Sequence, residues 1–301
     1  MYRIKKSAVA IAASIGLLGG LGIAAPAANA ATVKAPAGIP LKCTGSMLVS
    51  APTGQLYQTS LHRSGKVSFK KTVPKLGFAP TFLVNIGSMG GLDYPAWMRA
   101  TYFAVNKSGV AYFMDVSAYE RKGKSTVTKV NSKHKIGPGW QSTKLVTATY
   151  DRIFRLASNG KFYSYTSTKT GVSKTQLVFD NASGFTSVVH DRTVGKGSAK
   201  ADVLLATISN GELREYVIPR KNPRAAKQYT LRPAAAGWGG FTRITTSTCG
   251  KKGRIISAAL ADGRVAMYYD ANGSDFKGSD IRGGLTALPK VPAGYRIHSS
   301  L

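Results

Sequence analysis

Acidic residues are the scarcest large class in this 301-residue chain, because 13 Asp and Glu stand against 42 Lys and Arg and give a formal net charge of +29. A glycosidase needs two or three carboxylates that converge on one cleft, and few sets of residues here meet that condition. Histidine is also rare, and the four residues His62, His134, His190 and His298 have no ligand spacing. The sequence therefore predicts no metal site, no cofactor and no catalytic triad.

The best available acids are Asp93, Asp151 and Asp191. The strand pattern described below places all three in connections on one face of the molecule, although the connections differ in length. Whether these carboxylates converge cannot be decided from the sequence. Each also has an arginine nearby, and we expect surface ion pairs with Arg99, Arg152 and Arg192 rather than catalysis. A secreted glycoside hydrolase of a five-bladed propeller family is the alternative.

Long apolar runs are missing after the first 30 residues. The start combines Arg3, Lys5 and Lys6 with an Ala-, Gly-, Ile- and Leu-rich run over residues 7–25 and the small residues Ala28-Asn29-Ala30. This pattern predicts a signal peptide over 1–30, and Pro and Gly in 31–40 predict a flexible leader. We expect a secreted, extracellular protein with no transmembrane anchor after signal cleavage.

Five short turns recur at near-constant spacing. They are separated by 55, 51, 51 and 52 residues, and each lies between an apolar run and a run that contains an aromatic residue: Thr53-Gly54, Ser108-Gly109, Asn159-Gly160, Asn210-Gly211 and Asp262-Gly263. A period of this length with short alternating strands is typical of a propeller or a solenoid of four-stranded units.

A second periodic signal runs in phase with the turns. A glycine–aromatic pair opens each unit, at Gly77-Phe78, Gly139-Trp140, Gly184-Phe185, Gly237-Trp238 and Gly294-Tyr295.

The first unit lacks such a strand, whereas the last pair has only a strand after it. We therefore predict that 295–301 completes the first unit beside strands at 42–50, 55–61 and 66–73. Such pairing removes an open sheet edge. The fold class is then all-β, a closed five-bladed propeller of four-stranded antiparallel blades in a single domain over 41–301.

Cys43 and Cys249 are the only cysteines. Export would keep such a pair oxidised, and the predicted ring brings their blades together, so we predict a structural disulfide at the seam.

The positive charge predicts polyanionic partners. Removing Arg3, Lys5 and Lys6 with the signal peptide lowers the net charge from +29 to +26. Most of the loop cations fall on the face that carries the connections between first and second and between third and fourth strands, so the field is expected to be lopsided. For an exported protein, anionic envelope polymers are the natural partners, and no motif indicates specific nucleic-acid binding. The charge also fits simple solubility. We expect a monomer.

The cycle of Gly-Trp, apolar strand, Asn/Asp-Gly and apolar strand with Tyr resembles the tachylectin family of five-bladed lectin propellers. The resemblance runs over nearly all of 41–301 and implies a non-catalytic protein that binds amino sugars in equivalent pockets, one per blade. The implied ligand-binding residues are aromatic rings and turn side chains, namely Trp140, Phe185, Trp238, Tyr295, Asn159, Asn210 and Asp262. The same residue types also suit inter-blade packing and tight hairpins, so the sequence leaves both roles open. A protein-binding adhesion or scaffold module is a further alternative.

Overall fold

The computed structural model of this chain describes residues 38–64, 66–73, 75–91, 97–121, 124–149, 151–168, 171–284 and 290–298. The predicted signal peptide and leader residues 31–37 lie outside these ranges, so they stay predictions. Ile39, which the sequence placed in the leader, is instead 1% exposed and belongs to a core cluster. The packed part of the chain therefore begins before residue 41.

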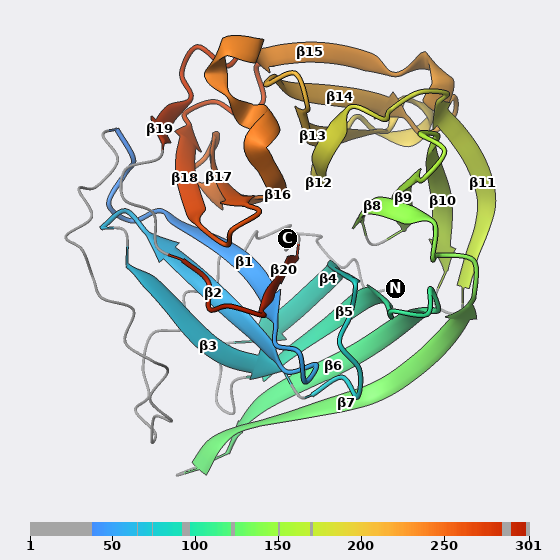
Figure 1. Cartoon of the computed structure of the whole chain (residues 1–301), viewed down its shortest axis with the longest axis vertical. Coiled ribbons are helices and arrows are strands. Elements are labelled where there is room, and N and C mark those ends of the chain that lie inside the picture. Colours follow the sequence, from blue (N-terminus) through green and yellow to red (C-terminus); the bar gives the residue numbers. More distant parts are fainter. Residues whose placement is uncertain are drawn as a thin grey trace, which may run out of the picture.

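Five antiparallel sheets of four strands stand around a common axis (Figure 1). Each is one blade, and the strands are given from the axis outward. Blade one contains β20 (Arg296–His298), β1 (Thr44–Ser50), β2 (Leu56–His62) and β3 (Val67–Val73). Blade two contains β4 (Phe82–Gly91), β5 (Trp97–Val105), β6 (Ala111–Arg121) and β7 (Lys124–Gly137).

The other three blades repeat this order. Blade three contains β8 (Thr143–Ala148), β9 (Arg152–Ala157), β10 (Phe162–Thr168) and β11 (Gly171–Phe179). Blade four contains β12 (Phe185–Val194), β13 (Ala201–Ile208), β14 (Leu213–Pro219) and β15 (Lys227–Arg232). Blade five contains β16 (Phe241–Cys249), β17 (Gly253–Leu260), β18 (Val265–Asp270) and β19 (Arg282–Gly284).

Helical structure in the described residues is confined to 3-10 turns in the connections. These are η1 (Gly197–Ala199), η2 (Pro223–Ala225), η3 (Ala234–Ala236) and η4 (Trp238–Gly240). No helix in the described ranges has the length and apolar character needed to cross a bilayer.

The C-terminal strand closes the ring, as predicted. Residues 296–298 of β20 pair antiparallel with residues 48–50 of β1, and the Ser50 hydroxyl lies 2.8 Å from Nε2 of His298. Of the predicted strand over 295–301, residues 299–301 lie outside the described part. The five-bladed propeller is thus confirmed, and it is the fold that the resemblance to the tachylectin family implied.

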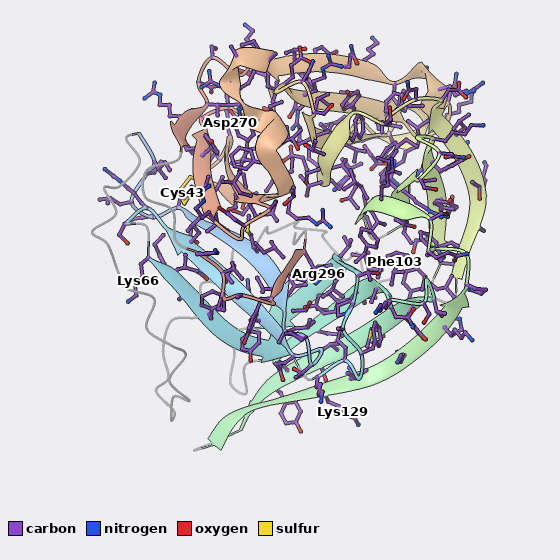
Figure 2. The ribbon with its side chains drawn as sticks, in the orientation of Figure 1. Cys43, Lys66, Phe103, Lys129, Asp270 and Arg296 are labelled. Carbon is purple, nitrogen blue, oxygen red and sulfur yellow. A yellow bond between two sulfur atoms is a disulfide. The ribbon has the colours of Figure 1, made fainter. Side chains whose placement is uncertain are left out.

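A disulfide joins Cys43 to Cys249 with a Cα–Cα distance of 5.5 Å, which confirms the predicted pair. Cys43 precedes β1 and Cys249 ends β16, so the bond links blade one to blade five at the seam (Figure 2). It closes a loop with a sequence separation of 206 residues. Constraint of so long a loop in the unfolded chain stabilises the fold by up to about 5 kcal/mol.

The turn glycines explain the period of the sequence, because each one ties its blade to the next. Gly211 has φ +100°, which favours glycine, and its N–H donates to the Ile208 carbonyl at 2.8 Å. Its own carbonyl accepts an N–H from Trp238 at 2.9 Å. The same link is repeated from Leu76 to Gly54, Trp140 to Gly109, Ala182 to Gly160 and Val291 to Gly263.

The core is divided among the blade interfaces. Buried apolar side chains form five clusters, and each joins two neighbouring blades, as Met47 of β1 and Ile255 of β17 do. Every residue of β13 is buried, since this second strand is covered on both sheet faces. Removal of apolar surface from water at these interfaces is therefore what holds the ring together.

Candidate functional site

An aromatic pair recurs in every blade. The aromatic residue of each glycine–aromatic pair packs on a tyrosine in the third strand of its own blade, with ring centroids 4.4–5.5 Å apart. The pairs are Tyr295–Tyr57, Phe78–Tyr112, Trp140–Tyr165, Phe185–Tyr216 and Trp238–Tyr268. The two periodic signals of the sequence are therefore the two halves of one contact.

The predicted tryptophans lie inside these contacts. Trp140 is 5% exposed and Trp238 is 2% exposed. Trp140 also packs on Phe103 at 4.8 Å, and the Arg155 guanidinium lies 5.0 Å from its ring. A sugar stacks on an exposed ring face, and neither indole offers one in this arrangement. Their measurable role is packing between blades.

Phe185 and Tyr295, the other two predicted rings, are only half-buried. Phe185 packs on Phe162, 5.5 Å away, as well as on Tyr216. These two residues are less completely enclosed than the indoles, and a stacking role for them stays a prediction.

The predicted turn residues are exposed, and their side chains stabilise the turns. Asn159 and Asn210 each accept an N–H from two residues ahead at 3.1 Å, and Asp262 accepts that of Arg264 at 3.0 Å. The Arg264 N–H, followed by its guanidinium, holds the pKa of Asp262 below its usual value. These are the bonds that make Asn and Asp common in tight turns.

Each Asn/Asp-Gly turn lies against the start of the next blade rather than against the aromatic residue of its own blade. Gly211 binds the N–H of Trp238, so the Asn210 turn lies against the aromatic residue that opens blade five. By the same link, the Asn159 turn lies beside the segment that leads to Phe185. In the sequence each of these turns follows the aromatic residue of its own unit, whereas in the fold it contacts the start of the next blade.

A buried cluster of opposite charges joins blades four and five. The Arg254 guanidinium lies 2.8 Å from Asp191, 2.5 Å from Glu215 and 2.7 Å from Asp270. All four side chains are at most 7% exposed. Burial alone would lower the pKa of Arg254, but the three carboxylates raise it overall. Burial raises the pKa of Asp270.

A second cluster joins blades three and four around Asp202. Its carboxylate lies 2.7 Å from Arg220, 3.5 Å from His190 and 4.0 Å from Arg152. Although burial opposes the shift, the hydrogen bonds from His190 and Arg220 lower the pKa of Asp202.

The predicted acid trio does not form a site in the described residues. Asp93 lies outside them, Asp151 pairs with Arg220 and Lys200, and Asp191 pairs with Arg192 and Arg254. Of the expected pairs, Asp191 with Arg192 is present but is buried rather than on the surface, because the Asp191 side chain is 7% exposed. Asp151 pairs with Arg220 of the next blade instead of Arg152, and Arg99 pairs with Asp115. In the described ranges, no group of three or more metal-ligating side chains comes together.

Exposed lysines gather at the end of the ring that carries the connections between strands one and two and between strands three and four. We call this end the loop face, and the opposite end, with the strand two–three turns and the blade links, the turn face. Six lysines of the loop face are exposed and form no ion pair with a described residue: Lys42, Lys66, Lys196, Lys221, Lys251 and Lys252. Figure 2 shows Lys66 toward the rim of the ring.

The arginine clusters were not found from the sequence. Arg254 belongs to blade five, whereas Glu215 and Arg220 belong to blade four. Only the folded ring brings them into contact, so periodicity carried no signal for them.

The chain and its fold can also be compared with known proteins. No protein-family model matches the chain, and no curated protein matches it. The solved structure of SapL1 lectin with α-methyl fucoside has a TM-score of 0.44 and 10% identity, over 90% of this chain and 86% of that one. A six-bladed fungal lectin from Aleuria aurantia gives 0.42 and 14%, over 82% and 75%. BBS1N in complex with ARL6DN gives 0.33 and 13%, over 83% and 66%. Scores this low carry no inference about the ligand.

Proposed function

We propose that this chain is a secreted, non-catalytic binding protein that holds anionic polymers of a cell surface, acidic glycans among them, on its loop face. The observation that carries the proposal is the set of exposed loop-face lysines without acidic partners. Lys251 and Lys252, for example, lie side by side in the connection between β16 and β17. These lysines, which form no ion pair with a described residue, lie on three neighbouring blades, four, five and one, and so suit a ligand with repeated negative charges.

The distribution of the acids favours binding over hydrolysis. A general acid needs a carboxylate that is protonated near neutral pH and open to substrate. Asp270 has a raised pKa because it is buried, yet its carboxylate is held by Arg254 at 2.7 Å. Asp151 and Asp202 have lowered pKa values despite burial, because arginines bind them. Their environment is that of structural ion pairs.

Amino-sugar binding is the finer form of the proposal that the resemblance to the tachylectin family suggests. Phe185 supports it, because its ring is half-buried and lies beside the segment bound by the Asn159 turn. A glycan array tests it with Asn159→Ala and Phe185→Leu, and Trp140→Phe serves as a packing control. Signals for hexosamines that vanish in the first two variants are expected. An array without any signal contradicts amino-sugar recognition while leaving polymer binding testable.

The polymer proposal is tested by retention on immobilised teichoic acid and heparin at increasing salt. Each phosphate or sulfate contact releases counterions, so log affinity should fall steeply with log salt. Lys251→Gln with Lys252→Gln should reduce that slope by about one to two units.

Lys107→Gln with Lys161→Gln is the matched control, since both lysines are exposed on the turn face and two charges are again removed. This control should leave the slope nearly unchanged. Retention that ignores salt, or equal effects of the two double variants, contradicts loop-face binding of polyanions.

A further inference from the structure

The turn-face end of the central channel is a small pocket to which all five blades contribute. Each innermost strand supplies lining residues, from Phe82 and Leu83 of β4, Leu145 and Val146 of β8, Ser187 and Val188 of β12, Arg243 of β16 and His298 of β20. The space holds about one water molecule or one ligand oxygen. It is thus suited to the end of a ligand rather than to a whole sugar ring.

Arg243 reaches across this channel. It is the third residue of β16 in blade five, yet its guanidinium carbon lies 5.9 Å from the ring of Phe82 in blade two. Blade one separates these two blades in the ring. The side chain therefore places its charge close to the axis. Its Nη1 donates to the Thr242 carbonyl at 2.6 Å, and the other guanidinium N–H groups have no bond to a described residue.

A second arginine lies at the same end. Arg296 opens β20 in blade one, which neighbours blade five, and Figure 2 shows it near the centre of the ring. Burial and then the charge of Arg296 lower the pKa of Arg243. Two cations thus repel each other at the channel mouth.

No negative charge in the part of the chain that the structure describes offsets this repulsion. Neither Arg243 nor Arg296 forms an ion pair with any acid in the described ranges, whereas Arg152, Arg220 and Arg254 all do. Burial and then the two arginines lower the pKa of His298 to about 3, so its imidazole is neutral and does not change the charge at this mouth. Its Nε2 is hydrogen-bonded to Ser50. A partly buried guanidinium with open donors and no carboxylate is a favourable anion ligand.

We propose that Arg243 and Arg296 bind one oxyanionic group, a carboxylate, sulfate or phosphate ester, at the turn-face mouth of the central channel. One oxygen of the group enters the pocket and accepts N–H bonds from Arg243, while the rest of the ligand stays outside beside Arg296. The apolar walls formed by Leu83, Val146 and Val188 keep the charge poorly screened, which strengthens these bonds. This site lies opposite the loop face and does not depend on polymer binding there.

Isothermal titration calorimetry with sodium sulfate and with sodium glucuronate tests the site. A single saturable event is expected for at least one of them. Arg243→Gln should weaken that binding by about tenfold or more, because it removes a charge-assisted bond. Arg296→Gln should weaken it less, and Arg243→Lys should retain part of it. Lys161→Gln, which removes an exposed charge from the same face, should stay within about twofold of the wild type.

The two ligands separate the chemical sources. Binding of sulfate alone indicates a tetrahedral ester or inorganic ion, and binding of glucuronate alone indicates a carboxylate, and both outcomes support the site. The proposal is overturned if neither ligand saturates, or if Arg243→Gln with an unchanged melting temperature binds as tightly as the wild type. A variant that melts earlier is assessed with Arg296→Gln, whose exposed side chain can change without disturbing the core. Loss of polymer retention in the Lys251 and Lys252 variants has no bearing on this result.

Discussion

Replacement of Arg254 by methionine should destabilise the ring more than any other single removal of an arginine. The substitution keeps an apolar stem of similar length but removes the one arginine that pairs with Asp270 in the described ranges, and it leaves Asp191 and Glu215 with Arg192 alone. Glu215 and Asp270 have side chains that are 0% exposed, and Asp191 is 7% exposed. Breaking a buried ion cluster by removal of one sign costs about 3–5 kcal/mol. For a domain of this size that corresponds to a fall in melting temperature on the order of 10 °C.

Thermal and urea unfolding at pH 7, with the disulfide intact, measure this cost. Arg264→Met is the matched control in the same blade, because its pair with Asp262 is surface-exposed, with side chains 53% and 44% accessible. An exposed pair contributes about 0–1 kcal/mol. Equal losses for the two variants, or a loss below about 1 kcal/mol for Arg254→Met, would refute the assignment of a structural role to the cluster.

The pH dependence gives the same prediction a second readout. Burial raises the folded-state pKa of Asp270, and without Arg254 no arginine opposes that shift, so the native variant binds more protons than its unfolded chain. Stability of the variant relative to wild type must then fall as pH rises and recover as pH is lowered toward about 4. A deficit that is constant across this range contradicts the mechanism.

Three further predictions concern stability. Cys249→Ser should cost about 2–5 kcal/mol in urea unfolding, since it opens the loop of 206 residues; an unchanged midpoint contradicts a stabilising seam. Gly211→Ala should destabilise more than Gly160→Ala, because an added Cβ meets a backbone carbonyl oxygen at 2.1 Å at the first position but has its nearest neighbour at 3.4 Å at the second; equal melting temperatures would argue against the turn-to-link contact. Asp202 has a lowered folded pKa, so its contribution is present above its unfolded value of about 3.9 and is lost as pH falls through the folded one; Asp202→Asn should therefore differ from wild type at pH 7 and converge with it in acid, as followed by circular dichroism.

The fold was predictable because its repeated contact leaves two marks in every unit. A glycine with positive φ is needed where the turn binds the next blade, and an aromatic residue is needed where that blade begins, as at Gly211 and Trp238. Both residues recur in phase, so the number of units could be counted. Closure followed from the missing strand at one end and the surplus strand at the other.

The chemistry of the ring was not predictable in the same way. Arg254 and Arg243 occupy strands whose equivalents in other blades carry different residues, so no pattern singled them out. Their partners also come from blades distant in sequence, as Phe82 does for Arg243. Periodicity shows what every blade shares, whereas ion clusters and channel residues depend on what one blade has and the others lack.

The measurement that tests the account most directly is hydrogen exchange, by mass spectrometry, of the segment 44–50 in the oxidised protein. In a closed ring β1 lies between β20 and β2, so the amides of Leu48, Val49 and Ser50 should exchange as slowly as those of β13 and β17. Truncation after Ala293 should make the amides that face β20 exchange quickly while those bonded to β2 stay slower. Rapid exchange of Leu48–Ser50 in the intact chain, or no change on truncation, would contradict a ring closed by the C-terminal strand.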